Sequence, residues 1–562
     1  MPGGRAGPVR GAYDPRPVTL SPPATERAPS GPPPERRGHR AAVALGRVPR
    51  PAPATVVLLV GVLAHAVVYA RLALLRQEAF WHARFDLGNM VQAVWSTAHG
   101  DPLSTTTARG EQISRLAAHV DPLIAVLAPL WWIWPSPDML LVVQAVAVAL
   151  GALPLYWLGR LWLDSDVLAL AGPAAYLLNP ALGWATVTEF HPVTLAPPLI
   201  LFAVWAAATR RDAALVVFAA LALLAKENVG LGMALLGVWI AFSLGRRRAG
   251  LVLSAVSLAW VATAIWVIIP RANEGPSVFI AGRYGDFGET PGDVIRGLVT
   301  RPDQAVTAIL EAERISYLLA LALPLAGLFL LAPLLAAGAL PDTLLNVLSS
   351  RLEQHQVEYH YTAVIVPFLV VGAVRGIAWL RARPPASPLG PLARRPWIPA
   401  AALVGATLAG GWHLGPLPVW SHLGGSDWRN NEYVVDTHAR VLARAVALVP
   451  ADGDVVVSAT NHVGAHLSAR RRIYLFPTVL DAEWVVIDRR RPETALGVTE
   501  ADLARGLSAM LARDDMERVF HQDGVSVFRR VGQQTGARHT SRALRAISSA
   551  TGTAANSSVR AT

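Results

Sequence analysis

The sequence predicts an α-helical multi-pass membrane protein with a small extracytoplasmic α/β domain after its last span. Of the 562 residues, 53% are hydrophobic and only 16% are charged, against roughly 25% charged in an ordinary soluble protein. Roughly seven or more apolar stretches approach or exceed the ~18 residues that a membrane span requires. Since a soluble core cannot bury so many uncharged stretches, we expect about ten or eleven spans.

The two ends of the chain and its composition predict the compartment. Residues 1–50 are rich in Pro, Gly and Arg without apolar periodicity, and residues 532–562 are polar, so both are predicted to be disordered tails. Arginines before the first span hold the N-terminus in the cytoplasm, and this positive-inside pattern accounts for much of the net charge of +11. We therefore expect a lipid bilayer, not nucleic acid, as the partner, and the cell membrane as the location. The chain has no cysteine, which excludes disulfides and cysteine metal sites.

Residues 51–415 are predicted to form the transmembrane domain, with outer loops near 76–118 and 271–315. The first span, residues 53–75, delivers the chain to the outside, and the later arginine clusters then all fall on the cytoplasmic side. These clusters are Arg160, Arg210 with Arg211, Arg246 to Arg248, and Arg381 with Arg383. The short segment 120–134 ends in tryptophans, which favours an outer-leaflet or half-inserted helix over a full span.

The pattern changes over residues 416–531 to that of a small extracytoplasmic α/β domain. The predicted elements are helices over 433–448 and 499–511, strands at 455–457 and 484–487, and a hairpin around Asp523-Gly524. Thr499 and Asp502 have the spacing of a capping box at a helix start. An Asp-Gly pair between two apolar runs is typical of a tight hairpin turn.

Candidate catalytic residues lie in two predicted outer turns. Asp86 follows the first span, where a partly shielded carboxylate could accept a proton from an acceptor hydroxyl. The alternative is that Asp86 caps the helix beginning at Leu87. Glu189 and His191 lie in the next outer turn and could orient a sugar, bind a metal or transfer protons. The alternative there is an interfacial turn capped by Glu189.

Lys226 and Glu227 interrupt apolar sequence at the outward end of a short predicted helix, and Lys226 is the one lysine of the chain. Ionisable residues at such depth are costly and are therefore functional candidates. Neighbouring helical residues point about 100° apart, so a direct ion pair between them is poorly arranged. We expect Lys226 to bind a phosphate, with mutual neutralisation by Glu227 as the alternative.

No metal or other cofactor is predicted, and a divalent metal stays an open alternative. His355, Glu358 and His360, followed by Tyr361, have spacing compatible with metal ligands, but a polar, aromatic interfacial loop is favoured. The sequence contains no phosphate-binding Gly-rich loop, nucleophile elbow or metalloprotease motif.

Several motifs together resemble the bacterial membrane family called domain of unknown function 2079. They are Phe85-Asp86-Leu87-Gly88, His119-Val120-Asp121-Pro122, Phe190-His191-Pro192, Lys226-Glu227-Asn228-Val229-Gly230 and His466-Leu467-Ser468-Ala469-Arg470. The resemblance covers roughly residues 60–490. Family members more often have Asp where this chain has Asn228, so no acidic role is assigned at that position.

That family in turn is similar to the GT-C superfamily of glycosyltransferases, which take sugars from polyprenyl-phosphate donors on the outer face of the membrane. The resemblance implies a GT-C-like fold, with Asp86 as the acid of the first outer loop and Glu189 as that of the second. His191 has no fixed counterpart. The paired acids common in the superfamily are absent, because Asp86 stands between Phe85 and Leu87.

The first functional hypothesis is therefore an inverting transferase. Asp86 would deprotonate an acceptor that attacks a lipid-linked sugar, and Lys226, with Arg84, would stabilise the leaving lipid phosphate. The alternative is a non-enzymatic protein, either a transporter or a scaffold for envelope partners. A transporter is expected to have related halves or broken helices that meet at the midplane of the bilayer.

Overall fold

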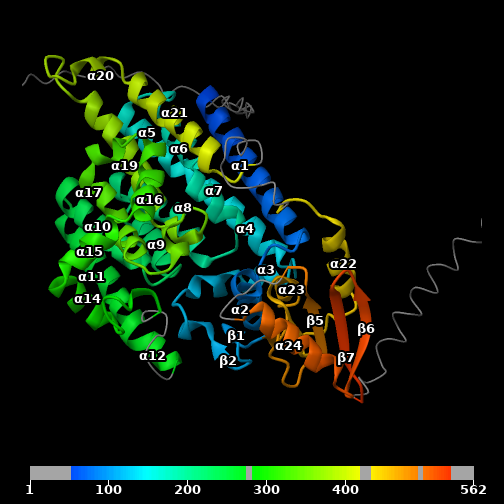
Figure 1. The fold of residues 1–562 in the computed structure, drawn as a ribbon. Coiled ribbons are helices and arrows are strands. Elements are labelled where there is room, and N and C mark those ends of the chain that lie inside the picture. The colour runs from blue at the N-terminus through cyan, green and yellow to red at the C-terminus, as the bar shows by residue number, and fades with distance from the viewer. Residues whose placement is uncertain (1–51, 274–281, 418–431, 492–497, 533–562) are drawn as a thin grey trace, which may run out of the picture. The chain divides into compact units, whose positions relative to one another are not determined.

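The structure is a computed structural model that describes residues 52–273, 282–417, 432–491 and 498–532. Both predicted tails lie outside the described residues. Most of residues 52–417 form helices, which Figure 1 labels in chain order. The first of them are α1 (Pro53–Glu78), α2 (Asn89–Ala98), α3 (Ala128–Trp131), α4 (Asp138–Leu150), α5 (Ala152–Leu163), α6 (Ala171–Leu177), α7 (Pro180–Val187), α8 (Ala196–Ala208), α9 (Asp212–Leu223) and α10 (Val229–Ser243).

The second half of this helical region begins with a long helix and continues in shorter pieces. These helices are α11 (Arg247–Thr263), α12 (Ile269–Ala272), α14 (Pro291–Thr300), α15 (Pro302–Ile309), α16 (Ala312–Ala322), α17 (Pro333–Ala336), α18 (Leu340–Val347), α19 (Ile365–Arg381), α20 (Gly390–Arg394) and α21 (Trp397–Leu414). A short 3-10 turn, Leu323–Leu325, follows α16, and the helical path breaks after it because Ala326 and Gly327 take positive φ angles, which a continuous right-handed helix cannot include.

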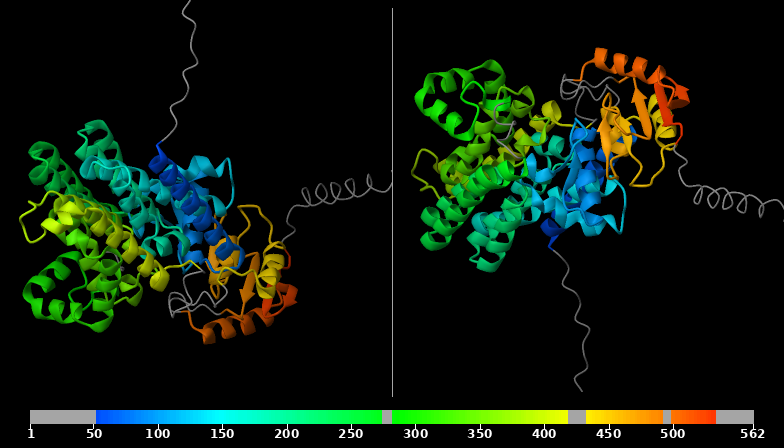
Figure 2. Two further views of the ribbon diagram at one scale, coloured as in Figure 1. Left: turned by 90° about the horizontal axis from the view of Figure 1, so that it is seen from above. Right: turned by 90° about the horizontal axis from the view of Figure 1, so that it is seen from below.

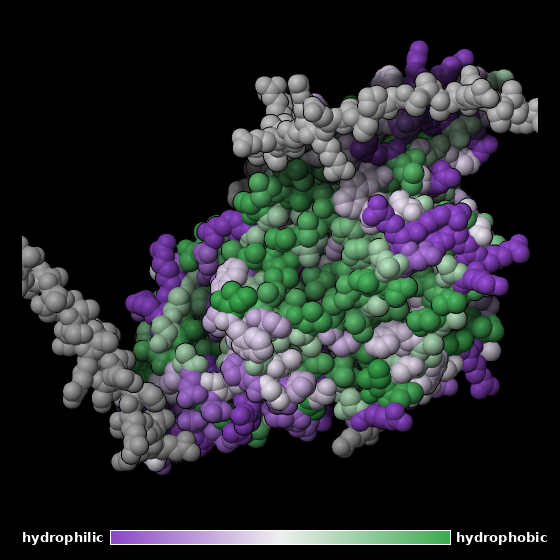
Figure 3. Space-filling model, turned by 180° about the vertical axis from the view of Figure 1, so that it is seen from behind, coloured by the Kyte–Doolittle hydropathy of each residue, from purple (hydrophilic) through white to green (hydrophobic). Residues whose placement is uncertain are grey.

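The helical region has the surface of a membrane protein. Exposed aliphatic side chains cover α1 and α11, among them Val60, Leu63 and Val252. Figure 3 shows one face on which apolar side chains form a broad area, with polar side chains mainly at its margins. Such a surface is unfavourable in water but matches the hydrocarbon core of a bilayer. The chain is therefore an α-helical multi-pass membrane protein, as the sequence predicts.

Helix lengths divide the apolar segments into two classes. Within the described residues, three helical stretches are long and apolar enough to cross a membrane: Pro53–Glu78, Asp138–Leu163 and Arg247–Ala272. Five shorter apolar helices accompany them: Pro122–Trp131, Leu168–Leu177, Pro192–Ala208, Asp212–Leu223 and Val229–Ser243. The segment ending at Trp131 is one of the short helices, and Trp132 and Ile133 after it are exposed.

A five-stranded sheet with three helices lies near the C-terminus. Its strands are β3 (Val457–Ala459), β4 (Ile473–Leu475), β5 (Trp484–Asp488), β6 (Met516–Gln522) and β7 (Val525–Arg530), and its helices are α22 (Thr437–Val446), α23 (Asn461–His466) and α24 (Glu500–Leu511). The strand order is β4-β3-β5-β7-β6, with the first three parallel and the last pairs antiparallel. The predicted hairpin is confirmed as β6–β7, and the capping box between Thr499 and Asp502 is confirmed at α24.

The sheet has an apolar core on each of its faces because side chains alternate along a strand. Val485 and Ile487 pack with α24 on one face. Val486 packs with α22 and α23 on the other. Figure 2 shows these helices covering the sheet. The second sheet is a small hairpin of β1 (Ser104–Thr106) and β2 (Gln112–Ser114), within the predicted first outer loop.

Candidate active site

Asp86 lies on a one-turn π-helix, η1 (Arg84–Gly88), between the end of α1 and the start of α2. The carboxylate of Glu189 holds this turn from the following predicted outer turn. Its Oε1 accepts a hydrogen bond from the backbone N–H of Ala83 at 2.9 Å, and its Oε2 accepts one from Leu87 at 3.1 Å. These are free N–H groups at a helix start, which need acceptors when they are buried.

This geometry bears on both predictions for Glu189, the catalytic role and the capping of its own turn. The side chain is only 8% exposed, and both carboxylate oxygens accept backbone hydrogen bonds. Burial and the nearby Asp86 raise the pKa of Glu189 well above its usual value, in spite of these bonds. Glu189 therefore fixes the turn that presents Asp86, and a catalytic role for it stays a prediction.

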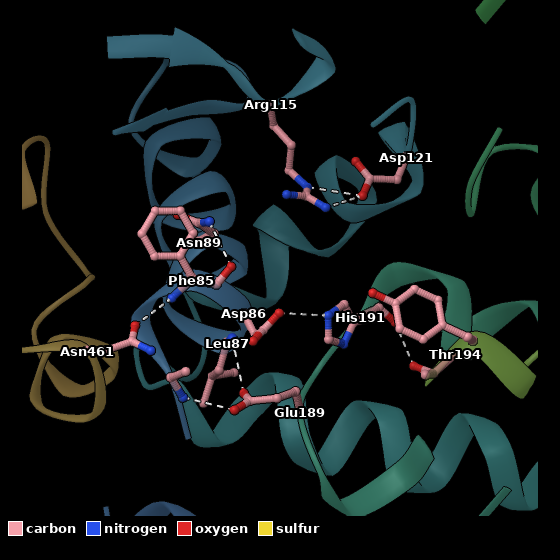
Figure 4. Close-up of polar contacts among 12 residues, drawn as sticks. Phe85, Asp86, Leu87, Asn89, Arg115, Asp121, Glu189, His191, Thr194 and Asn461 are labelled. Carbon is pink, nitrogen blue, oxygen red and sulfur yellow. Dashed lines mark hydrogen bonds and ion pairs between the residues drawn. The ribbon is translucent and has the colours of Figure 1, made fainter. Parts of the chain in front are cut away.

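Asp86 and His191 come together, as Figure 4 shows. Nε2 of His191 lies 3.2 Å from Oδ1 of Asp86, and the Asp86 side chain remains 46% exposed while that of His191 is nearly buried. Helix α2 begins at Asn89 and has no side-chain cap, so the capping alternative for Asp86 is wrong. A half-exposed carboxylate oriented by an imidazole is an arrangement suited to a general base.

The tautomer of His191 follows from the hydrogen-bond partners of its two ring nitrogens. Because Asp86 accepts a hydrogen bond, Nε2 carries the proton, and Nδ1 is buried with no hydrogen-bond partner in the described part of the chain. Burial lowers the pKa of His191, although Asp86 partly opposes this. His191 is therefore neutral near pH 7 and donates one hydrogen bond to Asp86.

A ring stack extends the site from His191. The ring of His360 lies 3.5 Å from that of His191, centroid to centroid, and Tyr361 lies 4.2 Å from His360. The hydroxyl of Thr188 donates to the backbone carbonyl of Glu358 at 2.9 Å, which ties the two turns together. In the sequence, His360 and Tyr361 stand out only through a spacing compatible with metal ligands. Their position beside His191 depends on a contact between distant segments.

Cations border the far side of this stack. The ammonium of Lys226 lies 5.9 Å from the centre of the Tyr361 ring, and the guanidinium of Arg283 lies 5.5 Å from it. Arg283 also donates to the Tyr361 hydroxyl at 3.4 Å. Burial lowers the pKa of Lys226, against the attraction of Glu227. Within the described residues no hydrogen bond or ion pair holds the Lys226 ammonium, so it is available to an anionic ligand.

The Glu227 carboxylate is engaged by the predicted first outer loop, and its substrate-binding role stays a prediction. Its carboxylate accepts hydrogen bonds from His119 Nδ1 and from the backbone N–H of Val120, both at 2.9 Å. Burial alone would raise the pKa of Glu227, but His119 and Lys226 outweigh it and hold the pKa at about 2. Glu227 therefore stays ionised and joins the Lys226 turn to the predicted first outer loop.

Arg84 lies inside the protein. Its side chain is fully buried, and one guanidinium nitrogen donates to the backbone carbonyls of Thr106 at 2.5 Å and Ile473 at 2.9 Å. A Cβ on Gly464 would lie 2.7 Å from the Arg84 Cβ, so η1 and α23 pack in direct contact. Arg84 therefore links the Asp86 turn to the C-terminal sheet, and its predicted contact with a leaving phosphate stays a prediction.

Three further residues at or near the site escaped the prediction. Asn461 Oδ1 accepts a hydrogen bond from the Phe85 N–H at 3.2 Å, so α23 contributes to holding the Asp86 turn. Arg115 and Asp121 form a buried ion pair at 2.5 Å near the site (Figure 4). Asp121 could have been selected from the sequence because it lies in one of the family motifs quoted above. No sequence pattern points to Asn461. Among the described residues, no group of three or more His, Asp or Glu side chains is arranged to hold a metal ion.

The comparisons with known proteins give a family. The sequence model of the family described as "Predicted membrane protein (DUF2079)" matches residues 76–502, more than half of the chain. The chain belongs to this family. The resemblance drawn from the motifs is thereby confirmed, and the match includes Asp86, His191, Lys226 and Asn461.

Solved structures similar to this chain include two of one protein. Both are crystal structures of ArnT from Cupriavidus metallidurans, one bound to undecaprenyl phosphate and one in the apo state. The first has 12% identity and a TM-score of 0.45 and covers 85% of this chain and 98% of ArnT. The second has 12% identity and a TM-score of 0.47, and it covers 84% of this chain and 98% of ArnT. Similarity at this level does not assign the activity of ArnT to this chain. No curated protein matches the chain.

Proposed function

We propose that this protein is a membrane glycosyltransferase that moves a sugar from a polyprenyl-phosphate donor to an envelope acceptor on the outer face of the membrane. The observation that carries the proposal is the half-exposed Asp86 carboxylate, oriented by neutral His191 at 3.2 Å. The ring stack that begins at His191 leads to the cations Lys226 and Arg283. A base and an anion-binding group thus border one region.

The proposed reaction balances with these groups. The acceptor hydroxyl gives its proton to Asp86, and its oxygen attacks the anomeric carbon from the face opposite the phosphate. The bond between the anomeric carbon and the phosphate oxygen breaks, and the lipid phosphate leaves with the electron pair. Lys226 and Arg283 would stabilise its charge in a site of low dielectric, where fixed cations act most strongly. The anomeric configuration inverts.

An open, shallow apolar cavity on the helix surface supports a lipid-linked donor. It has a volume of about 330 Å³ and lies between α9 and α11, with Leu223, Leu224, Val256 and Trp260 among its lining residues. The α9 side of the cavity ends at Leu224, two positions before Lys226. An apolar lining next to a cationic turn is complementary to a lipid chain that carries a phosphate.

The membrane topology proposed with this function puts the N-terminus in the cytoplasm and the C-terminal sheet region outside. The arginine clusters of the short loops support it. In this orientation the Asp86 turn, His191 and the Lys226 turn all face the outside, where a lipid-linked sugar and an envelope acceptor are both available.

The test compares wild-type protein with Asp86→Asn in nanodiscs supplied with labelled polyprenyl-phosphate sugars and cell-envelope acceptors. Asp101→Asn is the matched control, because Asp101 is an exposed acid of the same predicted loop. We expect transfer by wild type and by Asp101→Asn, with a loss of about 10²-fold or more in Asp86→Asn. Equal transfer by all three would remove Asp86 from the mechanism. Absence of transfer by wild type with every donor would favour the transporter or scaffold alternative.

A further inference from the structure

Gln144 lies on α4 inside the apolar stretch Asp138–Leu163, which is long enough to cross a membrane. It is the one side-chain amide of this stretch. The side chain is fully buried, and a polar group buried among apolar helices is costly unless its hydrogen bonds are made. The partners of this amide therefore show which part of the structure it serves.

The nitrogen of the amide binds the end of α7 and the turn that follows it. Gln144 Nε2 donates to the backbone carbonyls of Thr186 and Glu189, both at 2.9 Å, and to that of Ala185 at 3.3 Å. The last carbonyls of a helix have no partner within the helix. The amide therefore supplies donors both to the free end of α7 and to the turn that carries Glu189.

The oxygen of the same amide binds the other end of this turn. Gln144 Oε1 accepts a hydrogen bond from the His191 N–H at 3.2 Å, and the hydroxyl of Thr194 lies within hydrogen-bond reach of the same oxygen. Figure 4 shows this hydroxyl beside His191, where it lies 2.6 Å from the backbone carbonyl of that residue. One planar side chain therefore holds the backbone on both sides of position 190.

The packing of α4 depends on other side chains. Leu141, Ala145 and Val148 are fully buried and supply apolar contacts to the neighbouring helices. An apolar residue of similar length in place of Gln144 would therefore leave α4 in its position. The turn after α7 would lose both its donors and its acceptor.

We infer that Gln144 is a positioning residue that sets the backbone of the turn at residues 187–191 and, through it, the contact between His191 and Asp86. That contact is 3.2 Å long, so a displacement of about 0.5 Å breaks the hydrogen bond. The inference rests on the proposed function for its effect on rate, because the position of Asp86 affects a rate only if Asp86 takes part in a reaction.

The test uses Gln144→Met, which keeps a long, unbranched side chain and removes its polar atoms. Thr407→Val is the matched control, because Thr407 is also fully buried and its hydroxyl lies 2.7 Å from the distant Pro324 carbonyl. Protein with ¹⁵N-labelled histidine is studied by NMR in proteoliposomes, where the His191 signal is the one that His191→Asn lacks. The kcat and KM for sugar transfer are measured on the same preparations.

We expect the His191 Nε2–H signal to shift or broaden in Gln144→Met and to keep its wild-type position in Thr407→Val. We expect kcat to fall about tenfold or more at constant KM in Gln144→Met alone. An unchanged His191 signal in folded Gln144→Met would overturn the inference. An unchanged kcat would also overturn it, because the turn would then have no effect on the reaction.

Two provisions keep the result clear. Absence of transfer by wild type with every donor would count against the proposed function, and the NMR comparison would still decide whether Gln144 positions His191. Gln144→Asn replaces Gln144→Met if the latter lowers the thermal midpoint, because its shorter side chain draws the amide away from the turn. The same shift of the His191 signal is then expected, and its absence overturns the inference.

Discussion

Nε2 of His191 lies 3.2 Å from Oδ1 of Asp86, although 105 positions separate the two residues in the chain. The contact exists because each residue sits on a rigid turn. Glu189 holds the π-helical turn of Asp86 through two backbone N–H groups, and His191 follows Glu189 by two residues. One short segment therefore both fixes the backbone around Asp86 and supplies its hydrogen-bond donor.

Removal of the His191 donor tests this relationship. We expect His191→Ala to lower transfer by about 10²-fold, since a small displacement of a catalytic group has effects of that size. Donor and acceptor affinities should stay near wild type, because the loss acts on the position of Asp86. Steady-state kinetics check this through a fall in kcat at constant KM. His99→Ala is the control, since His99 is an exposed imidazole of the predicted first outer loop. A rise in KM alone would contradict the positioning role.

The hydrogen bond from Phe85 N–H to Asn461 predicts a role for the C-terminal sheet region in holding Asp86. Asn461→Asp keeps an acceptor oxygen. Asn461→Ala leaves the Phe85 N–H without this acceptor, which costs about 1–3 kcal/mol of folding free energy. A nitroxide on Asp86→Cys in the cysteine-free chain reports the mobility of the turn by its spectrum. We expect faster motion with Asn461→Ala and wild-type motion with Asn461→Asp. Equal spectra for the two variants would show that Asn461 does not restrain the turn.

Lys226 should determine the affinity for a lipid phosphate. We expect Lys226→Met to weaken binding of polyprenyl phosphate in nanodiscs by about tenfold or more, equivalent to about 1.4 kcal/mol or more. Arg109→Met is the control, because Arg109 is an exposed cation of the predicted first outer loop. Similar weakening by both variants would indicate general charge attraction. The depth of a label at Lys226→Cys adds a second result, since a midplane position would favour transport over transfer.

Buried histidines should make the protein sensitive to acid. Burial lowers the pKa of His466 from 6.5 to about 4, so the folded state prefers the neutral ring. For a group whose pKa is depressed on folding, the stability is present above the unfolded pKa and is lost as the pH falls from 6.5 toward 4. At pH 5 this single site destabilises the fold by about 2 kcal/mol.

The measurement is the thermal midpoint in detergent at pH 7.5 and pH 5. We expect the midpoint of the wild type to fall with acidification and that of His466→Gln to fall less. His521→Gln, at an exposed imidazole of the C-terminal hairpin, is the control and should follow the wild type. An equal fall in all three proteins would exclude His466 as a source of the acid sensitivity.

Several features follow from the sequence alone because they depend on neighbours in the chain. Long apolar stretches predict membrane helices, since length and composition decide whether a segment is stable in lipid. The capping box at Thr499 and the hairpin turn at Asp523 are local hydrogen-bonding and backbone preferences. Asp86 and His191 could be selected because they lie in predicted outer turns, and Lys226 because an ionisable side chain that interrupts apolar sequence needs a reason to be there.

The tertiary structure alone decided what those and other side chains do. Glu189 and Arg84 are buried and Glu227 is nearly so, and each of these charged residues is bonded to the backbone of a distant segment. His360 and Asn461 join the site only because remote turns pack against η1 and His191. Burial and hydrogen-bond partners are properties of contacts between segments far apart in the chain, and no local pattern encodes which carboxylate remains open to a ligand.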